Sequence, residues 1–202
     1  MQRNSFRVLS SVVALATSVA MTGCSAVHEP IASSPVDRGQ SSSVAAQIDY
    51  ARAHFKNPNR SEFGDLGGTD CVNFTSLTLL ARGWKMTPQW SFRQGATEPY
   101  SRAWISSTAF RDYLDTKPQL ATPLSWEARN KVAPGDVVQF DWDNSGDRDH
   151  TAVISGITTD AITGERVLLV TSHSPAAFDW PIDQVLSEHG DEARVFFWHL
   201  SQ

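Results

Sequence analysis

The residue most suited to chemistry is Cys71, which follows a glycine-rich loop and begins a predicted helix. The loop spans 57–69, and the helix opens with Asp-Cys-Val-Asn-Phe-Thr-Ser at 70–76 and should end near Gly83. Free backbone N–H groups and the helix dipole favour a thiolate there, and the thiolate is the reactive form of a cysteine nucleophile. We therefore predict a nucleophile whose thiol pKa lies well below its ordinary value. A buried structural cysteine is the alternative.

Two polar neighbours of Cys71 are expected to support the start of this helix. Asp70 stands at the N-cap position, where its carboxylate can accept hydrogen bonds from the free N–H groups of the first turn. Asn73 lies within that turn and is a second candidate support. Backbone N–H groups near Cys71 would hold the oxyanion that forms when an amide carbonyl is attacked.

Two histidines could act with the thiol, because both stand at the ends of predicted strands. His150 follows a polar hairpin and opens a strand, so it is expected at the edge of the sheet, facing a cleft. His173 follows the next strand, and a regular antiparallel hairpin would bring it beside His150. A base for the thiol proton and a group that orients this base complete a catalytic triad. For each histidine, the alternative is a side chain without a catalytic role that is either hydrogen-bonded within the fold or exposed to solvent.

The elements that must position these residues are helices first and strands afterwards. Apolar residues at 44, 48, 51 and 55 recur at helical spacing behind Ser43, which is the expected N-cap. The further predicted elements are a helix over 107–116 and β-rich runs over 137–142, 151–157, 167–171 and 195–200. This order indicates an α+β fold, with N-terminal helices packed on a C-terminal antiparallel sheet.

Aromatic residues gather in the irregular segment 84–105. Trp90 and Trp104 are the two that could line a substrate cleft. A tryptophan is more often part of a core, and that alternative stays open.

The first residues have the pattern of an export signal. Residues 1–23 carry Arg3 and Arg7, then an apolar run and small residues, with no acidic side chain. The exit Met-Thr-Gly-Cys resembles a bacterial lipobox, which implies cleavage before Cys24 and lipidation of its thiol. The run is shorter than the roughly 20 apolar residues of a transmembrane helix. Ordinary signal cleavage beside an incidental cysteine is the alternative.

A flexible tether is expected to separate this anchor from the folded domain. Residues 24–43 are rich in Ser, contain Pro and lack aromatic side chains, so they cannot bury enough apolar surface to fold. The folded domain is therefore predicted to span 44–202, exported and held at the cell membrane by the lipid, facing the cell wall.

Charge and cysteine content bound the possible partners. The chain has 17 Lys and Arg against 22 Asp and Glu, a net charge of -5, which argues against a nucleic-acid partner. Two cysteines permit one disulfide. A lipid on Cys24 and a nucleophilic role for Cys71 would leave neither available for it.

The acidic turn over 141–149 is one further pattern. Oxygen donors alternate and Gly146 stands sixth, as in the first part of an EF-hand loop, but Ala152 replaces the closing glutamate. A solvated turn is the simpler alternative. No metal ion and no cofactor is predicted, and a calcium-dependent adhesin-like module remains a third hypothesis.

Taken together and in this order, the motifs resemble the bacterial putative amidase domain family. They are Asp-Cys-x-Asn-Phe-x-Ser at 70–76, Trp104 with Phe-Arg-Asp-Tyr-Leu at 110–114, Gly-Asp-Val-Val at 135–138 before Asp-His, and a later Ser-His. That family is similar to NlpC-type cell-wall peptidases among the papain-like cysteine hydrolases. The resemblance covers about 44–200.

The resemblance implies a papain-like fold and a cysteine amidohydrolase. Cys71 would be the nucleophile, His150 the general base and acid, and His173 the residue that orients His150. Peptidoglycan stem peptides are the substrate class that the resemblance and the predicted export favour. A non-catalytic cell-wall binding or scaffolding lipoprotein on the same fold is the alternative, because fold alone does not settle function.

Overall fold

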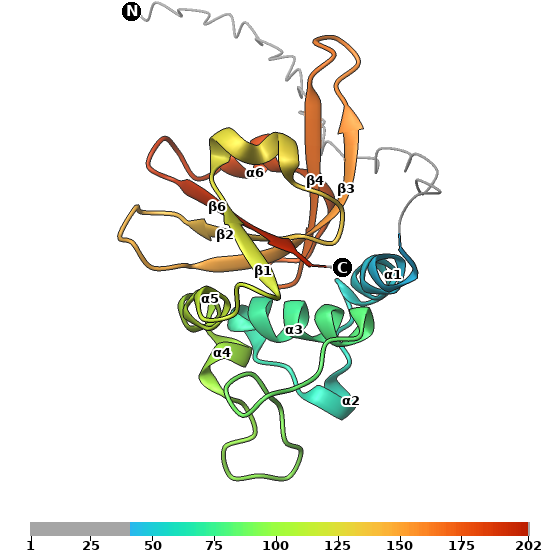
Figure 1. Cartoon of the computed structure of the whole chain (residues 1–202), viewed down its shortest axis with the longest axis vertical. Helices are drawn as coiled ribbons and strands as arrows, with labels where there is room; N and C mark the ends of the chain where they lie inside the picture. Colours follow the sequence, from blue (N-terminus) through green and yellow to red (C-terminus); the bar gives the residue numbers. More distant parts are fainter. Residues whose placement is uncertain (1–40, 202) are drawn as a thin grey trace, which may run out of the picture.

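In the computed structural model, the helices α1 to α5 precede all the strands along the described chain, and only the short helix α6 lies among the strands (Figure 1). The structure describes residues 41–201. The predicted export signal over 1–23, the lipidation site Cys24 and most of the predicted tether over 24–43 lie outside these residues. Within 41–201, no helix is both long and apolar enough to cross a membrane. The helices are α1 (Ser42–His54), α2 (Arg60–Phe63), α3 (Cys71–Arg82), α4 (Arg102–Ile105), α5 (Ser107–Asp115) and α6 (Ile182–Ser187), with 3-10 turns η1 (Gly67–Thr69) and η2 (Trp126–Lys131).

The strands form one antiparallel sheet in the order β1-β6-β2-β3-β4-β5. They are β1 (Ala121–Leu124), β2 (Val137–Asp141), β3 (His150–Thr159), β4 (Arg166–Ser172), β5 (Ala177–Pro181) and β6 (Arg194–Leu200). The strands β2 to β5 follow one another as neighbours, and β6 returns to lie between β1 and β2. The predicted α+β class, with helices and an antiparallel sheet, is confirmed.

The helix that begins at Cys71 is the central element of the helical layer. Ten of its twelve residues are buried, so it packs on several sides at once. It ends where predicted, because Gly83 takes the left-handed conformation with φ 105° and its N–H bonds back to the helix. The first helix begins slightly earlier than expected, since the N-cap is Ser41 rather than Ser43 and its hydroxyl accepts from the N–H of Val44.

Two apolar cores lie on the two faces of the sheet, and helices cover both faces (Figure 1). The core toward α3 and α5 includes Val137 and Trp198, whereas the core toward α6 includes Val138 and Phe197. Neighbouring residues of one strand therefore point to opposite faces, as strand geometry requires. This alternation decides which side chains can reach Cys71.

A buried arginine joins the helical layer to the sheet. The guanidinium of Arg82 donates to the side-chain oxygen of Gln47 at 2.8 Å and to the carbonyl oxygen of Leu200 at 3.4 Å. Gly135, with φ +90°, lies directly against this group: a Cβ there would be 2.7 Å from the arginine Nη1. The Pro-Gly-Asp turn that precedes β2 therefore requires glycine for conformation and for space.

Candidate active site

Cys71 is the first residue of α3 and its thiol is nearly buried, with 6% of the residue exposed. Its sulfur lies 3.7 Å from the hydroxyl oxygen of Ser107, the first residue of α5. Burial raises the pKa of this thiol, although hydrogen bonds from Ser107 and from the backbone N–H groups of Thr151 and Val72 act to lower it. The predicted low thiol pKa is therefore wrong for this structure, because desolvation outweighs the donors at the helix start.

The donors around Ser107 form a buried polar chain that no motif in the sequence indicates. The side-chain amide of Gln139 donates to the carbonyl oxygen of Ser107 at 2.8 Å and to the hydroxyl of Thr151 at 3.2 Å. The Thr151 hydroxyl donates in turn to the Ser107 hydroxyl at 2.9 Å. Because the Ser107 hydroxyl oxygen accepts this bond, its hydroxyl hydrogen is free to point at the sulfur of Cys71. This chain favours the thiolate.

Asp70 occupies the N-cap position but does not cap the helix. Its Oδ1 accepts from the backbone N–H of Leu66 at 2.8 Å and from the amide of Asn73 at 2.9 Å, and no side-chain capping bond forms. The prediction of a carboxylate cap is wrong because the Asp70 backbone, at φ −84° and ψ 1°, is not in the extended conformation that lets an N-cap side chain turn back onto the helix. Burial raises the pKa of Asp70.

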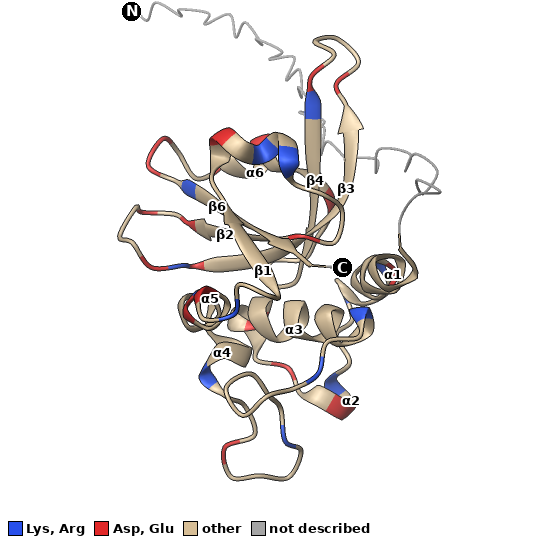
Figure 2. Ribbon diagram, in the orientation of Figure 1, with Lys and Arg blue, Asp and Glu red and all other residues tan. Residues whose placement is uncertain are grey.

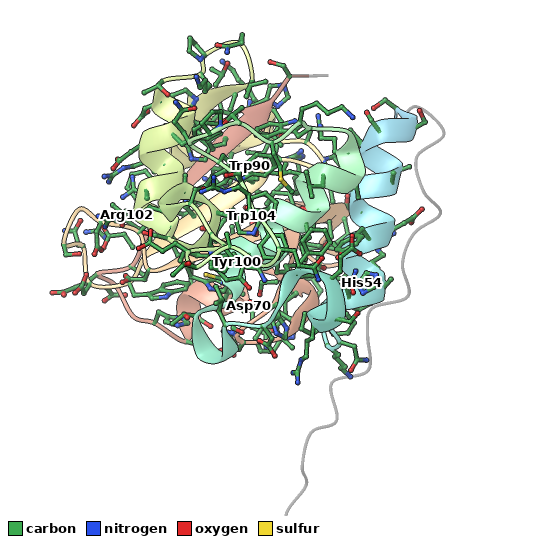
Figure 3. The ribbon with its side chains drawn as sticks, turned by 90° about the horizontal axis from the view of Figure 1, so that it is seen from below. His54, Asp70, Trp90, Tyr100, Arg102 and Trp104 are labelled. Atoms are coloured by element: carbon green, nitrogen blue, oxygen red, sulfur yellow. The ribbon has the colours of Figure 1, made fainter. Side chains whose placement is uncertain are left out.

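Asn73 is fully buried and directs its amide toward Asp70 and Trp104. Its Nδ2 donates to Asp70, and its Oδ1 accepts from the indole N–H of Trp104 at 2.8 Å. These bonds make Asn73 a support for Asp70. In the view of Figure 3, Trp104 and Asp70 lie near the middle of the molecule, with Tyr100 labelled between them.

The two tryptophans expected to line a substrate cleft are buried instead. Trp90 and Trp104 have no exposed surface, and their ring centroids lie 4.8 Å apart. The indole N–H of Trp90 donates to the hydroxyl of Ser76 at 2.9 Å. The cleft prediction is therefore wrong, because both rings are enclosed by the helices and both polar ends find partners in the core.

His173 lies beside the residue that precedes the predicted nucleophile. Its Nδ1 is 2.7 Å from the carbonyl oxygen of Phe55, so Nδ1 carries the hydrogen and donates. Its Nε2 faces Asp70 Oδ2 at 3.8 Å, and this oxygen has no hydrogen-bond partner among the described residues. The side chain of His173 is therefore directed toward Asp70, and the expected position beside the ring of His150 is not observed.

His150 opens β3 as predicted, but its side chain turns away from α3. The next residue, Thr151, points toward Ser107, so alternation sends His150 to the other face, where its ring centroid is 6.0 Å from that of Phe140. Within 41–201, no hydrogen bond joins its ring to the thiol. The β3–β4 register pairs Val153 with Thr171, which sets Thr151 rather than His150 level with His173. The expectation that both histidines meet the thiol is therefore not met in this structure.

Burial lowers the pKa of His150 to about 4, with the nearby His189 lowering it further. The unfolded chain takes up this proton as the pH falls below about 6.5, whereas the folded chain takes it up only near 4. The free energy of unfolding should therefore decrease by about 3 kcal/mol between these values. Urea unfolding at pH values from 7 to 4 measures how the free energy of unfolding changes with pH. The His150→Phe protein should lack this contribution. If its free energy of unfolding changed with pH as much as that of the wild-type protein, the lowered pKa of His150 would be contradicted.

Among the residues that the structure describes, two groups of side chains have ligand atoms close enough to share a metal ion. One group is Asp65, Asp70 and His173, and the other is the acidic turn after β2, visible in Figure 2. In the first, Asp65 is already bound by Arg60 at 2.7 Å and by a backbone N–H. The four carboxylates of the turn are those of Asp141, Asp143, Asp147 and Asp149, and backbone N–H groups donate to three of them. Calcium binding at this turn stays an untested alternative.

The architecture is thus an α+β domain in which the first residue of a buried helix presents a thiol to an antiparallel sheet. The profile of the family described as "Putative amidase domain" matches residues 41–198, which is most of the chain. The chain belongs to this family, and membership supports amide hydrolysis in general.

One curated relative is the uncharacterized protein YjcM of Bacillus subtilis (strain 168). The two sequences are 26% identical over 157 residues, a region that covers 74% of this chain and 35% of YjcM. The chain therefore corresponds to about a third of that protein. No solved structure matches the chain significantly.

Proposed function

We propose that the chain is a cysteine amidohydrolase in which Cys71 is the nucleophile. The proposal is supported by the hydrogen-bond donors that surround the thiol. It lies at the start of α3, with the Ser107 hydroxyl at 3.7 Å and two backbone N–H groups directed at it. Donors that stabilise a thiolate also stabilise the oxyanion of a tetrahedral intermediate when they reach the carbonyl oxygen.

In the proposed reaction, the sulfur of Cys71 bonds to the amide carbonyl carbon and the thiol proton passes to His150. His150 then gives this proton to the leaving nitrogen as the C–N bond breaks, which leaves a thioester. A water molecule, deprotonated by His150, attacks the thioester and restores the thiol. Burial lowers the pKa of His150 to about 4, so its ring is uncharged at neutral pH but is a weak base in this buried position.

The proposal requires a movement of the His150 side chain. The ring belongs to the residue next to Thr151, whose backbone N–H is directed at the sulfur. Catalytic hydrogen bonds are often poorly aligned before the substrate binds. Substrate binding would therefore turn the ring toward the thiol. We assign His173 the role of a positioning residue, which acts through Asp70 on the start of α3.

The finer assignments extend the proposal beyond the site. A papain-like arrangement, peptidoglycan stem peptides as substrates, and an exported lipoprotein anchored through Cys24 agree with the resemblance and with the export pattern of the first residues. Release of peptides from purified peptidoglycan tests the substrate class directly.

Thiol alkylation tests the nucleophile. Iodoacetamide should modify Cys71, and the loss of amide hydrolysis should follow the fraction modified, as measured by mass spectrometry of the Cys71 peptide. Because burial raises the thiol pKa, the reaction should be slow at neutral pH and faster at alkaline pH. Full activity in completely modified protein contradicts the proposal.

Replacement of Ser107 tests the donor chain. Ser107→Ala removes the hydroxyl that points at the sulfur, so the thiol pKa should rise and kcat/KM should fall about tenfold. The alkaline shift of the pH profile of kcat/KM separates this role from a structural one. Thr108→Ala is the matched control, because Thr108 is the next residue of α5 but bonds to Arg148. Equal pH profiles in both variants would argue against the chain.

A non-catalytic binding module on the same fold is the second candidate. The observation that favours it is the raised pKa of the Cys71 thiol, since an inert cysteine is typically buried and protonated. This candidate predicts binding to cell-wall material without peptide release. No peptide should then be released before or after alkylation of Cys71, whereas the enzyme releases peptides and loses this activity on alkylation.

A further inference from the structure

Three side chains from separate segments of the chain converge beside the start of α3. They are Asp65 from the loop before η1, Asp70 directly before α3, and His173 from the turn after β4. One ligand atom of each lies within 4.8 Å of the ligand atoms of the other two. The sulfur of Cys71 does not belong to this group, although Cys71 follows Asp70 in the chain. No ligand spacing in the sequence predicts the group, because His173 lies far from both aspartates along the chain.

The carboxylate of Asp70, which Figure 3 labels, gives an independent indication that a cation belongs here. The residue has no exposed surface, and its Oδ1 accepts from Leu66 and Asn73. Its Oδ2 has no hydrogen-bond partner among residues 41–201 and lies 3.8 Å from Nε2 of His173. Leaving a buried polar atom unpaired costs free energy, and the cost is larger for a charged group.

The hydrogen bond on the other side of the imidazole ring leaves a lone pair on Nε2. Nδ1 of His173 donates to the carbonyl oxygen of Phe55 at 2.7 Å, and a neutral ring that donates from Nδ1 can only accept at Nε2. Two acceptor atoms, Nε2 and the Asp70 oxygen, therefore face each other, and a positive centre between them would satisfy both. Histidines that bind metal ions typically donate their other N–H to a carbonyl or carboxylate in this way.

The distance between these two atoms favours a metal ion over a proton. A charge-assisted N–H···O bond would bring the nitrogen and the oxygen to about 2.7–2.9 Å, roughly 1 Å closer than the observed 3.8 Å. Two ligands of a tetrahedral zinc ion, with bonds of about 2.0–2.2 Å, lie about 3.4 Å apart, which requires a change of only about 0.4 Å. Zinc binding therefore requires the smaller rearrangement.

The chemistry of the three ligands also selects zinc. Calcium and magnesium prefer oxygen ligands in larger number, whereas zinc accepts imidazole and carboxylate together and is satisfied by four ligands. Three protein ligands would leave the fourth position to a water molecule. Asp65 can contribute although Arg60 approaches its Oδ2 at 2.7 Å, because the side chain of Arg60 is 67% exposed and such an ion pair is weak.

We propose that Asp65, Asp70 and His173 bind one zinc ion, which ties the loop before α3 and the turn after β4 to the start of this helix. The ion would supply the link between His173 and Asp70 that no hydrogen bond provides in the described structure. The site lies beside Cys71 but contains no thiol, so the proposal does not depend on the proposed function.

Titration of zinc into the metal-free full chain tests the site. Calorimetry on protein freed of metal with EDTA and then of EDTA should show zinc binding, and zinc should raise the melting temperature because it binds the folded state. Calcium and magnesium at the same concentration should do neither. Asp70→Asn and His173→Gln each remove a ligand while keeping a polar side chain, so each should weaken zinc binding at least about 100-fold. Wild-type protein that binds no zinc would overturn the proposal.

Two control variants locate the ion. Asp147→Asn alters the other carboxylate group, in the turn after β2, and should bind zinc as the wild-type protein does. Cys71→Ala should also keep its affinity for zinc, which measures the site in a protein without the proposed nucleophile. Cobalt(II) bound in place of zinc should show no sulfur-to-metal charge-transfer band.

Three results would place the ion elsewhere and overturn the proposal. They are an unchanged zinc affinity in both ligand variants, shown to be folded by thermal melting, a loss of zinc binding in Cys71→Ala, and a sulfur band in the cobalt spectrum. Amide hydrolysis is measured separately. Its absence would reject the proposed function, whereas the zinc affinities would still decide whether Asp70 and His173 bind the ion.

Discussion

Cys71→Ala is expected to lower kcat/KM for amide hydrolysis by at least about 1,000-fold. The reason is that no other side chain near the start of α3 can form the acyl intermediate in the proposed reaction: Ser107 already directs its hydrogen at the sulfur, and its oxygen accepts from Thr151. Loss of a nucleophile removes covalent catalysis but leaves substrate binding and the oxyanion donors, so residual activity would be small but measurable. Initial rates with an anilide or a peptide amide measure the effect.

The control for this substitution is the stability of the variant. Cys71 is nearly buried, and alanine removes only its sulfur, so the free energy of unfolding should change by about 1 kcal/mol. Cys71→Ser keeps the shape of the side chain and should be equally inactive if a thiolate is required. A folded Cys71→Ala protein that keeps more than a tenth of the activity would exclude the proposed nucleophile.

The sequence predicted the helix that presents the thiol because its signals are local. A glycine-rich loop precedes Cys71, and Gly83 in the left-handed conformation follows the last turn, so both ends of α3 were found correctly. The strands β2, β3, β4 and β6 were found from their β-branched and aromatic residues. The antiparallel arrangement followed from the turns between them.

The faces of the strands could not be predicted, because these strands are buried on both sides. All five residues of β2 and the first six of β3 are buried, so polar and apolar residues do not alternate in a way that shows which face meets α3. A difference of one residue moves a side chain to the other face. For this reason the sequence led to the prediction that the His150 side chain faces the thiol. In the structure it is the neighbouring residue, Thr151, that faces the thiol.

Other elements escaped prediction because their signals are short. The edge strand β1 contains Pro123, which weakens a strand pattern, and β5 ends in Pro181 directly before the six-residue helix α6. Missing β5 and α6 also hid a cavity beside His150, whose wall contains Trp180 and Val185. A pocket built from elements distant in sequence leaves no motif in the sequence.

Trp104→Ala is expected to destabilise the protein by about 3–5 kcal/mol, the cost of deleting a large buried aromatic side chain. Trp104 has no exposed surface and packs on Trp90 at 4.8 Å between ring centroids. Its indole N–H also satisfies the oxygen of Asn73, whose amide in turn holds Asp70 beside the thiol. The substitution therefore removes packing and a polar support together. Urea unfolding measures the loss.

Trp104→Phe separates these two contributions. Phenylalanine keeps most of the apolar contact but leaves the Asn73 oxygen buried without a donor, which should cost about 1–3 kcal/mol. Released from Trp104, Asn73 would hold Asp70 less firmly, so kcat should fall although the protein stays folded. Trp90→Phe is the matched control, because it breaks a similar bond, to Ser76, that does not lead to Asp70. Equal kcat values in the two phenylalanine variants would show that Trp104 serves the core alone, whereas a lower kcat in Trp104→Phe would establish that Asn73 carries its effect to the start of α3.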